Sequence, residues 1–239
     1  MIRESVVVLI GAAGLAGSAS AGPIINEYVA NHTGSDDMEF VEVFADPGMD
    51  LSGLTLLQIE GDSSSSGFGS IDSAITLSTA DANGFWTTGF LTNEIENGTQ
   101  TLLLVDGFTG VKGGDLDTDN DGIIDVALPW TSILDSIGVN DGGSGDTDYG
   151  LADTVLFAGF DGGSFTVGGA SRIPNGVDTD SIADWMRNDF NKAGYPGFPL
   201  DTLDPGEALN TPGTFNAVPS PGSLTLLGVA GLALVRRRR

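Results

Sequence analysis

Short runs of apolar residues, each followed by turn-forming residues, recur along the middle of the chain. Three of these runs predict strands, at Ile24–Val29, Met38–Phe44 and Leu54–Ile59. The segments between them, Asn31–Asp37 and Asp46–Gly53, are rich in the small and polar residues of turns. This spacing is typical of a protein built from strands and tight turns.

The second run carries apolar residues on both faces. Successive side chains of a strand point to opposite sides, so Val41 and Val43 share one face while Phe40, Glu42 and Phe44 share the other. A strand that is apolar on both sides is expected in the middle of a sandwich. Weaker strand patterns occur at Ala74–Leu77, Trp86–Phe90, Gln100–Val105, Thr154–Phe157 and Ser164–Val167.

Helix-forming patterns are scarce. The segment Asp184–Asn191 is expected to be a short helix or an irregular loop, and glycine is abundant, with 36 residues in the chain. Short strands joined by Gly- and Asp-rich turns predict an all-β fold, an antiparallel β-sandwich.

The N-terminal residues have the order of a secretory signal peptide. A positive charge at Arg3 precedes the apolar stretch Val6–Ala16, and the small residues Ala19-Ser20-Ala21 follow. This order predicts residues 1–21 as a signal peptide that signal peptidase cleaves after Ala21 during export. The apolar stretch is too short for a membrane span, which needs about 20 residues.

The C-terminal residues 218–239 combine three features. The pair Pro219 and Pro221 precedes the apolar run Leu224–Val235, and the arginines Arg236, Arg237, Arg238 and Arg239 end the sequence. The apolar run can enter a bilayer as a helix, and the arginines resist translocation. The segment resembles a PEP-CTERM sorting signal, with Ser220 in place of the usual glutamate. That resemblance implies transient or lasting membrane attachment and processing by an exosortase-type protease.

Charge is distributed very unevenly. Of the nine Lys and Arg residues five lie in the two terminal segments, whereas of the 33 Asp and Glu residues only Glu4 does. Residues 22–217 therefore carry a large negative charge, which disfavours nucleic acid as a partner. A salty medium, or divalent cations that neutralise clustered carboxylates, would tolerate it. The chain has no cysteine, so disulfides and thiol chemistry are excluded.

One acidic segment has the spacing of a calcium loop. Asp117, Asp119 and Asp121 alternate, Gly122 follows, and Asp125 occupies the ninth position of such a loop. Three carboxylates on alternate residues can converge on one hard cation while the glycine makes the bend. The adjacent pair Ile123-Ile124 is expected to anchor the loop. These four aspartates are the predicted metal ligands, for a structural Ca²⁺.

Two features limit this interpretation. Position twelve of an EF-hand loop would be Leu128, so the bidentate glutamate is missing, and no amphipathic helices flank the segment. The loop is more similar to those of thrombospondin type 3 repeats, with an expected affinity on the order of 0.1 to 1 mM. The alternative is a solvated acidic loop without a specific ion. A second acidic stretch, Asn140–Asp148, either completes the site or is a plain loop, and its irregular spacing favours the loop.

Several segments together resemble the lamin-tail domain, an immunoglobulin-like sandwich. They occur in the family's order across residues 22–217, which exceed the usual module and carry an acidic insertion at about 106–150. The matching segments are Ile25-Asn26-Glu27, Glu39-Phe40-Val41-Glu42-Val43, Asp50-Leu51-Ser52-Gly53-Leu54-Thr55-Leu56, Asn97–Leu102, Ser171–Gly176 and Thr211–Asn216. The resemblance implies an immunoglobulin-like fold and a bacterial surface protein.

Enzymatic signatures are few. The only histidine, His32, is expected in a surface turn, and without cysteine or a second histidine the familiar nucleophilic triads and zinc sites cannot be assembled. Glu39 and Glu42 are three positions apart on one strand, and because this number is odd their side chains would point to opposite faces. Trp86, Trp130 and Trp185 fit core positions better than a sugar-stacking surface.

The sequence therefore predicts an exported, non-catalytic protein of the cell envelope, cell surface or extracellular matrix. Its expected partners are the export machinery, signal peptidase, an exosortase-type protease and the membrane, with extracellular polysaccharide as a further candidate. The alternative is a secreted calcium-dependent carbohydrate-binding module or hydrolase, because aspartates suited to acid–base chemistry abound.

Overall fold

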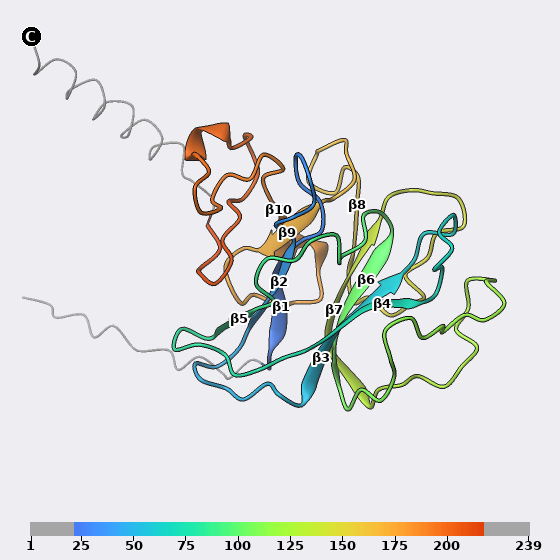
Figure 1. Ribbon diagram of the computed structural model, residues 1–239. Coiled ribbons are helices and arrows are strands. Elements are labelled where there is room, and N and C mark those ends of the chain that lie inside the picture. The colour runs from blue at the N-terminus through green and yellow to red at the C-terminus, as the bar shows by residue number, and fades with distance from the viewer. Residues whose placement is uncertain (1–21, 218–239) are drawn as a thin grey trace, which may run out of the picture.

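The computed structural model describes residues 22–217, which form two five-stranded sheets (Figure 1). The first sheet has the order β10-β9-β1-β2-β5 and the second the order β4-β3-β6-β7-β8. The strands are β1 Ile24–Val29, β2 Phe40–Phe44, β3 Leu54–Glu60, β4 Ile71–Thr76, β5 Phe85–Thr87, β6 Gln100–Asp106, β7 Ser132–Asn140, β8 Val155–Phe157, β9 Gly169–Arg172 and β10 Trp185–Arg187. All neighbouring strands pair antiparallel except β7 and β8, which are parallel.

The two terminal segments fall outside these residues. The predicted signal peptide (1–21), the apolar helix expected near the C-terminus and the sorting-signal residues Pro219, Pro221 and Arg236–Arg239 are not described. Within residues 22–217 no helix has the length and apolarity that a membrane span requires.

The main core lies between the sheets. Val41 and Val43 of β2 and Leu102 and Leu104 of β6 belong to one cluster of buried apolar side chains, so the inner faces of both sheets share a single core. This is the face that alternation assigned to Val41 and Val43. Trp86 and Trp185 join the same cluster, as predicted, and are 9% and 5% exposed.

Both sheets are also covered on their outer faces. Leu57, Ile59 and Leu103 of the second sheet form a separate cluster with Leu116, which belongs to the acidic loop between β6 and β7. On the first sheet, residues that follow β10 cover the outer face, since Tyr195 packs against β1 and β2. In Figure 1 this segment, orange to red, lies beside β9 and β10. Long connections therefore bury the outer faces of the two sheets, on which Phe40 and Leu57 lie.

Three strands escape the sequence pattern. β7, β9 and β10 were not predicted, and Ser164–Val167, expected to be a strand, has no regular structure. The segment expected as a helix or loop at Asp184–Asn191 begins as β10, after a single 3-10 turn at Ile182–Asp184. β7 lies inside the range 106–150 expected as an insertion, so the acidic loop proper is residues 107–131.

Two of the missed strands, β7 and β9, carry buried charged side chains. Asp135 of β7 and Arg172 of β9 are 1% and 2% exposed. Arg172 Nη2 donates to Asp135 Oδ1 at 2.9 Å, which joins the two sheets through a buried ion pair. The Arg172 guanidinium also lies 4.5 Å from the ring centre of Trp185. Charged residues can occupy core strands when they have such partners. A strand that contains them, however, lacks the apolar alternation from which it could be predicted.

Candidate metal-binding loop

The acidic loop is anchored to the second sheet by apolar residues on either side of its aspartates. Leu116 is buried in the outer cluster, and Ile124 packs partly buried against the same cluster. Ile123 is 67% exposed, so the expected anchor pair is in fact Leu116 and Ile124. Asp125 N donates to Leu116 O at 3.0 Å and closes the base of the loop.

Asp117 is the organising residue of the loop. It is fully buried, and its carboxylate accepts from the backbone N–H groups of Asp121 (3.1 Å) and Gly122 (2.8 Å). The hydroxyl of Tyr149 donates to it at 3.2 Å. These two backbone donors and one hydroxyl hold the loop wrapped around the Asp117 carboxylate.

Three of the four predicted ligands come together. Asp117, Asp119 and Asp121 each present a carboxylate oxygen within 4.8 Å of the others. The side chains of Asp119 and Asp121 are exposed, and the Asp121 charge, first among several causes, raises the pKa of Asp119. No ion pair among residues 22–217 involves any of the three. The group is thus a set of convergent anionic oxygens without a basic partner.

Asp125 does not join this group. Its carboxylate accepts from the hydroxyl of Thr118 at 2.6 Å and from the Thr118 N–H at 3.2 Å, and these bonds lower its pKa. Asp125 therefore closes the loop through its hydrogen bonds to Thr118. It lies outside the alternating positions 117, 119 and 121, whose carboxylates come together.

Backbone conformation explains two residues of the loop. Asn120 and Gly122 have φ of +57° and +87°, the left-handed region that Asn tolerates and Gly adopts freely. The reversal of the chain at these positions turns the N–H groups of residues 121 and 122 toward Asp117. The glycine that the sequence placed at the bend therefore has the expected role.

The second acidic stretch packs beside the first without joining its carboxylates. Asp141 Oδ1 and Asp146 Oδ2 lie 2.9 and 2.8 Å from the Thr99 hydroxyl. Asp146 also accepts from the Ser63 N–H at 3.0 Å. Both carboxylates thus tie the loop after β7 to Thr99, just before β6, and Asp146 also ties it to the loop between β3 and β4. Tyr149, which follows this stretch, is hydrogen-bonded to Asp117 of the first acidic loop.

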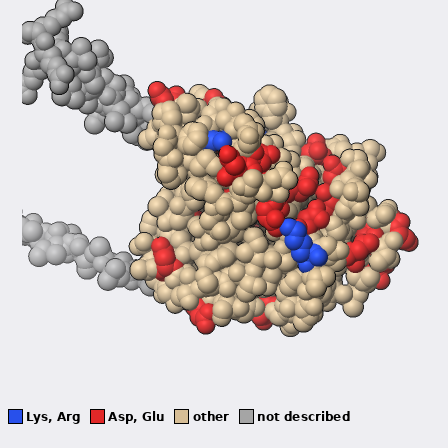
Figure 2. Space-filling model, in the orientation of Figure 1, with Lys and Arg blue, Asp and Glu red and all other residues tan. Residues whose placement is uncertain are grey.

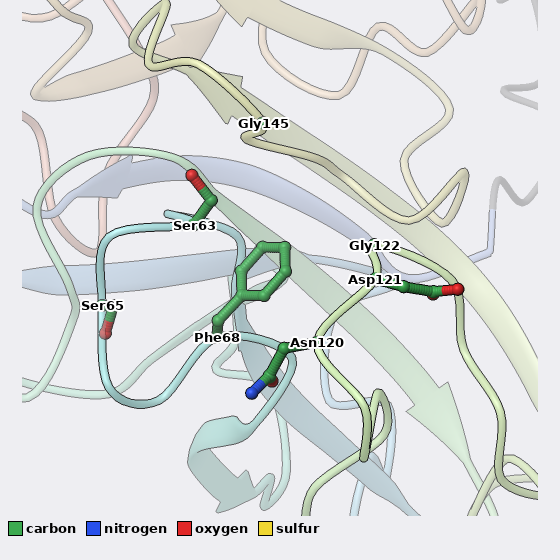
Figure 3. A pocket seen from close by; sticks show the side chains of 7 residues that line it. All are labelled: Ser63, Ser65, Phe68, Asn120, Asp121, Gly122 and Gly145. Atoms are coloured by element: carbon green, nitrogen blue, oxygen red, sulfur yellow. The ribbon is translucent and has the colours of Figure 1, made fainter.

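A cavity of about 250 Å³ lies where these loops meet. It is lined by Ser63, Ser65, Phe68, Asn120, Asp121, Gly122 and Gly145. Figure 3 shows the Phe68 ring at its centre and the Asp121 carboxylate pointing away from that ring. Solvent therefore reaches the turn at residues 120–122, as Ca²⁺ coordination by protein oxygens and waters requires.

His32 is not the surface residue that the sequence suggested. It is 2% exposed, its Nε2 accepts from Met38 N at 3.2 Å, and its Nδ1 lies 3.3 Å from Thr33 O. Burial lowers its pKa, and Tyr195 packs edge-on against the ring at 6.2 Å. A neutral, doubly hydrogen-bonded imidazole in this position stabilises the turn. Trp130 is half-buried against the outer cluster.

Glu39 and Glu42 bond to different parts of the chain. Glu39 Oε2 accepts from the N–H groups of Glu94 (2.8 Å) and Ile95 (3.0 Å), which orders the loop after β5. Glu42 Oε2 accepts from Gly213 N at 2.6 Å. Each carboxylate serves a separate segment, as their odd spacing on the strand indicated.

A buried polar network closes the first sheet and was not expected. Glu27 and Glu42 are cross-strand partners on β1 and β2. Thr211 donates to Glu27 from its N–H at 3.0 Å and its hydroxyl at 2.9 Å, while Gly213 N reaches Glu42. Asn216 Nδ2 donates to carbonyls of β1 and β9. Segments from both ends of residues 22–217, several of them in the lamin-tail resemblance, thus meet at this network.

The two buried glutamates carry unusual protonation. Burial, with the nearby Glu27 charge second, raises the pKa of Glu42 to about 9, and burial raises the pKa of Glu27 to about 7. No ion pair among residues 22–217 includes either carboxylate. Two adjacent carboxylates in a low-dielectric site cannot both ionise cheaply, so the pair retains a proton near neutral pH.

Two further acidic groups assemble from distant positions. Each brings three carboxylates within 4.8 Å of one another: Glu60, Asp72 and Glu96 in the first, and Asp189, Asp204 and Glu207 in the second. Neither group has a regular spacing in the sequence from which it could be predicted. Figure 2 shows the acidic residues gathered in patches on the visible face, with few basic residues among them.

Comparisons with known proteins bring no relative to this arrangement. No protein-family model, no curated protein and no solved structure matches the chain.

Proposed function

We propose that the protein is an exported, non-catalytic component of the cell surface or extracellular matrix, in which the 117–121 loop binds calcium as a structural ion. The observation that carries the calcium assignment is the convergence of Asp117, Asp119 and Asp121 within 4.8 Å. The loop is preformed around the buried Asp117, so binding requires little reordering. Oxygen-only ligands and an adjoining open cavity suit Ca²⁺.

The structural role follows from where the loop lies. Leu116 and Ile124 connect it to the apolar outer face of the second sheet, and Tyr149 connects Asp117 to the loop after β7. A cation bound there would lower the repulsion among the three carboxylates and hold both loops over the sheet. Asp125, engaged with Thr118, supports the loop from outside the ligand group.

The exported surface role is supported by the sequence. The signal-peptide pattern of residues 1–21, the sorting-signal pattern of residues 218–239 and the acidic segment between them all agree with an extracytoplasmic site of action. The immunoglobulin-like, lamin-tail assignment belongs to this proposal too. It is supported by two facing sheets and by the polar network at which Glu27, Glu42 and Thr211 meet.

Thermal unfolding tests the calcium site. At about 5 mM Ca²⁺ and a Kd on the order of 0.1 to 1 mM, binding would stabilise the fold by about 1–2 kcal/mol. For a domain of this size that is about 2–8 °C in Tm relative to EDTA. Asp119→Asn, which removes an exposed ligand, should abolish the part of the shift that this loop contributes. Asp201→Asn removes the same charge from an exposed position outside all three acidic groups and should leave it unchanged. Equal midpoints in EDTA and calcium would remove this loop as a stabilising calcium site.

Mass spectrometry of the secreted protein tests export and sorting. We expect the mature chain to begin at Gly22 and, after processing, to lack the terminal arginines Arg236–Arg239. Retention of both segments in the cytoplasm would overturn the assignment.

A carbohydrate-binding role is the second candidate, favoured by a cavity of about 740 Å³ at the end of the first sheet. Phe165, 81% exposed, and Phe190, 45% exposed, both line it beside amide and carboxylate side chains. Exposed aromatic faces next to polar groups are suited to stack on sugar rings. A polysaccharide pull-down with and without calcium tests this, with Phe165→Ala as the variant expected to lose binding. No binding to any polysaccharide would leave the scaffold role alone.

A further inference from the structure

The 740 Å³ cavity contains the second distant acidic group. Asp189 follows β10, and Asp204 and Glu207 come from the segment that pairs beside it, where Asn188 forms a bridge with Ala208. All three carboxylates line the cavity, with ligand oxygens within 4.8 Å of one another. Asp189 is 2% exposed, so one member is deeply buried.

Within residues 22–217 no basic side chain forms an ion pair with this group, and the Arg187 charge is the last of the causes that act on the pKa of Glu207. Arg187 lines the same cavity, but its guanidinium bonds to Asp161 at 3.0 and 3.2 Å and to the carbonyls of Phe165 and Thr166. Lys192 lies 3.6 Å from Asp37. Among residues 22–217 no ion pair includes Asp189, Asp204 or Glu207. The group is held together by the backbone: Asp189 accepts from Ala193 N at 2.7 Å and Asp204 N at 2.9 Å.

Two residues that line the cavity, Glu207 and Asn210, each hold a buried oxygen that has no hydrogen-bond partner in residues 22–217. Asn210 is fully buried and lines the cavity; its Nδ2 donates to Asp189 O and Ala193 O, while its Oδ1 is unpaired. Glu207 Oε2, within the acidic group, is likewise enclosed and unpaired. An unpaired buried acceptor costs about 1–3 kcal/mol unless something satisfies it. Burial first, and the charges of Asp189 and Asp204 next, raise the pKa of Glu207 to about 7.

We propose that Asp189, Asp204 and Glu207, with the Oδ1 of Asn210, bind one divalent cation, Ca²⁺ in an extracytoplasmic setting. A cation would satisfy both unpaired oxygens and remove the repulsion of three carboxylates at once. All ligands are oxygens, which excludes a thiolate or imidazole zinc site here, and the open cavity can supply the waters that complete a calcium shell. The bound ion would fasten residues 204–210, which continue into the polar network at Thr211, to the end of β10.

Calorimetric titration of the full chain with Ca²⁺ alone tests the site. Asp119→Asn/Asp121→Asn removes two of the three ligands of the first loop, and we expect this variant still to bind one equivalent. Adding Asp204→Asn and Glu207→Gln should abolish that remaining binding. Asp204→Asn alone, added to the Asp119→Asn/Asp121→Asn background, changes an exposed residue whose Oδ2 accepts from the Asn191 amide, and it should weaken the remaining binding at least about tenfold. Asp201→Asn, which lies three residues away and outside the group, is the matched control and should bind as the wild type does.

The outcomes are separable from those of the first loop. Binding that Asp119→Asn/Asp121→Asn keeps and that is lost when Asp204→Asn is added supports the second site, whether or not the first loop binds calcium. The proposal is overturned if Asp119→Asn/Asp121→Asn binds no calcium, or if Asp204→Asn and Glu207→Gln together leave affinity and stoichiometry unchanged. Far-ultraviolet circular dichroism of each variant verifies that the sheets are intact.

Discussion

The ion pair between Arg172 and Asp135 provides the sharpest test of what holds the two sheets together. Its nitrogen–oxygen distance is 2.9 Å, and its side chains are 2% and 1% exposed. Arg172 also donates to Ile25 O and Val177 O and stacks on Trp185. The substitution Arg172→Met keeps most of the volume of the side chain and leaves the Asp135 charge buried without its partner.

Breaking such a buried pair by removing one member costs about 3–5 kcal/mol. Residues 22–217 form a fold in which each kcal/mol corresponds to about 2–4 °C, so Tm should fall by about 6–20 °C. The assay is urea and thermal unfolding at pH 8. Tryptophan fluorescence monitors the unfolding, because Trp185 lies against Arg172. Burial raises the pKa of Asp135 to about 7 despite the opposing effect of Arg172. The cost should therefore shrink at pH 5, where the Asp135 carboxyl holds a proton with or without Arg172.

A matched control uses the exposed pair Lys112–Glu94. That pair is shorter, 2.6 Å, but its side chains are 56% and 31% exposed. Solvent screens it, so Lys112→Met should cost less than about 1 kcal/mol. If Arg172→Met at pH 8 costs no more than Lys112→Met does, burial of the ion pair is not what ties the sheets together, and the reasoning fails.

Three further predictions concern the loops and the polar network. Because the pKa of Glu42 rises from 4.5 to about 9, the folded chain holds a proton that the unfolded chain has released. The free energy of unfolding should therefore fall from pH 6 to pH 9, which urea titrations at each pH would measure. Glu42→Gln should flatten this slope. Gly69→Ala places a Cβ 2.7 Å from the Asp117 Cβ at φ +80°, whereas Gly48→Ala, at φ +74°, meets nothing within 4 Å. Both variants bear about 1–2 kcal/mol of backbone cost, and only Gly69→Ala should also weaken calcium binding in calorimetry. Thr211→Val removes the hydroxyl that donates to Glu27 and should cost about 1–2 kcal/mol in urea unfolding; an unchanged midpoint would show that the network adds no stability.

The strands predicted from apolar patterns were those whose core residues are apolar. Ile24–Val29 was predicted with its observed bounds, and Phe40–Phe44 and Leu54–Glu60 within two residues. β7 and β9 were missed because Asp135 and Arg172 occupy core positions. Each is acceptable there only because the other lies opposite it, and that pairing spans 37 residues.

The candidate site divides in the same way. Asp117, Asp119 and Asp121 were predicted as a group because their spacing within one loop already brings them together. Asp125 was predicted with them and lies elsewhere, since a hydrogen bond to Thr118 holds it. The group of Asp189, Asp204 and Glu207 has no regular spacing, so only the folded chain could show it.

The sequence by itself determined the β class, the positions of the apolar strands, the excess of negative charge and the first acidic loop. Each of these depends on residues that are close in the chain, where alternation and spacing act directly. The tertiary structure alone decided which strands are neighbours, that His32 is buried, that Glu27 and Glu42 meet Thr211 and Gly213, and where the distant carboxylates converge. Those features depend on desolvation and hydrogen bonding between segments far apart in sequence, and such contacts exist only once the chain has folded.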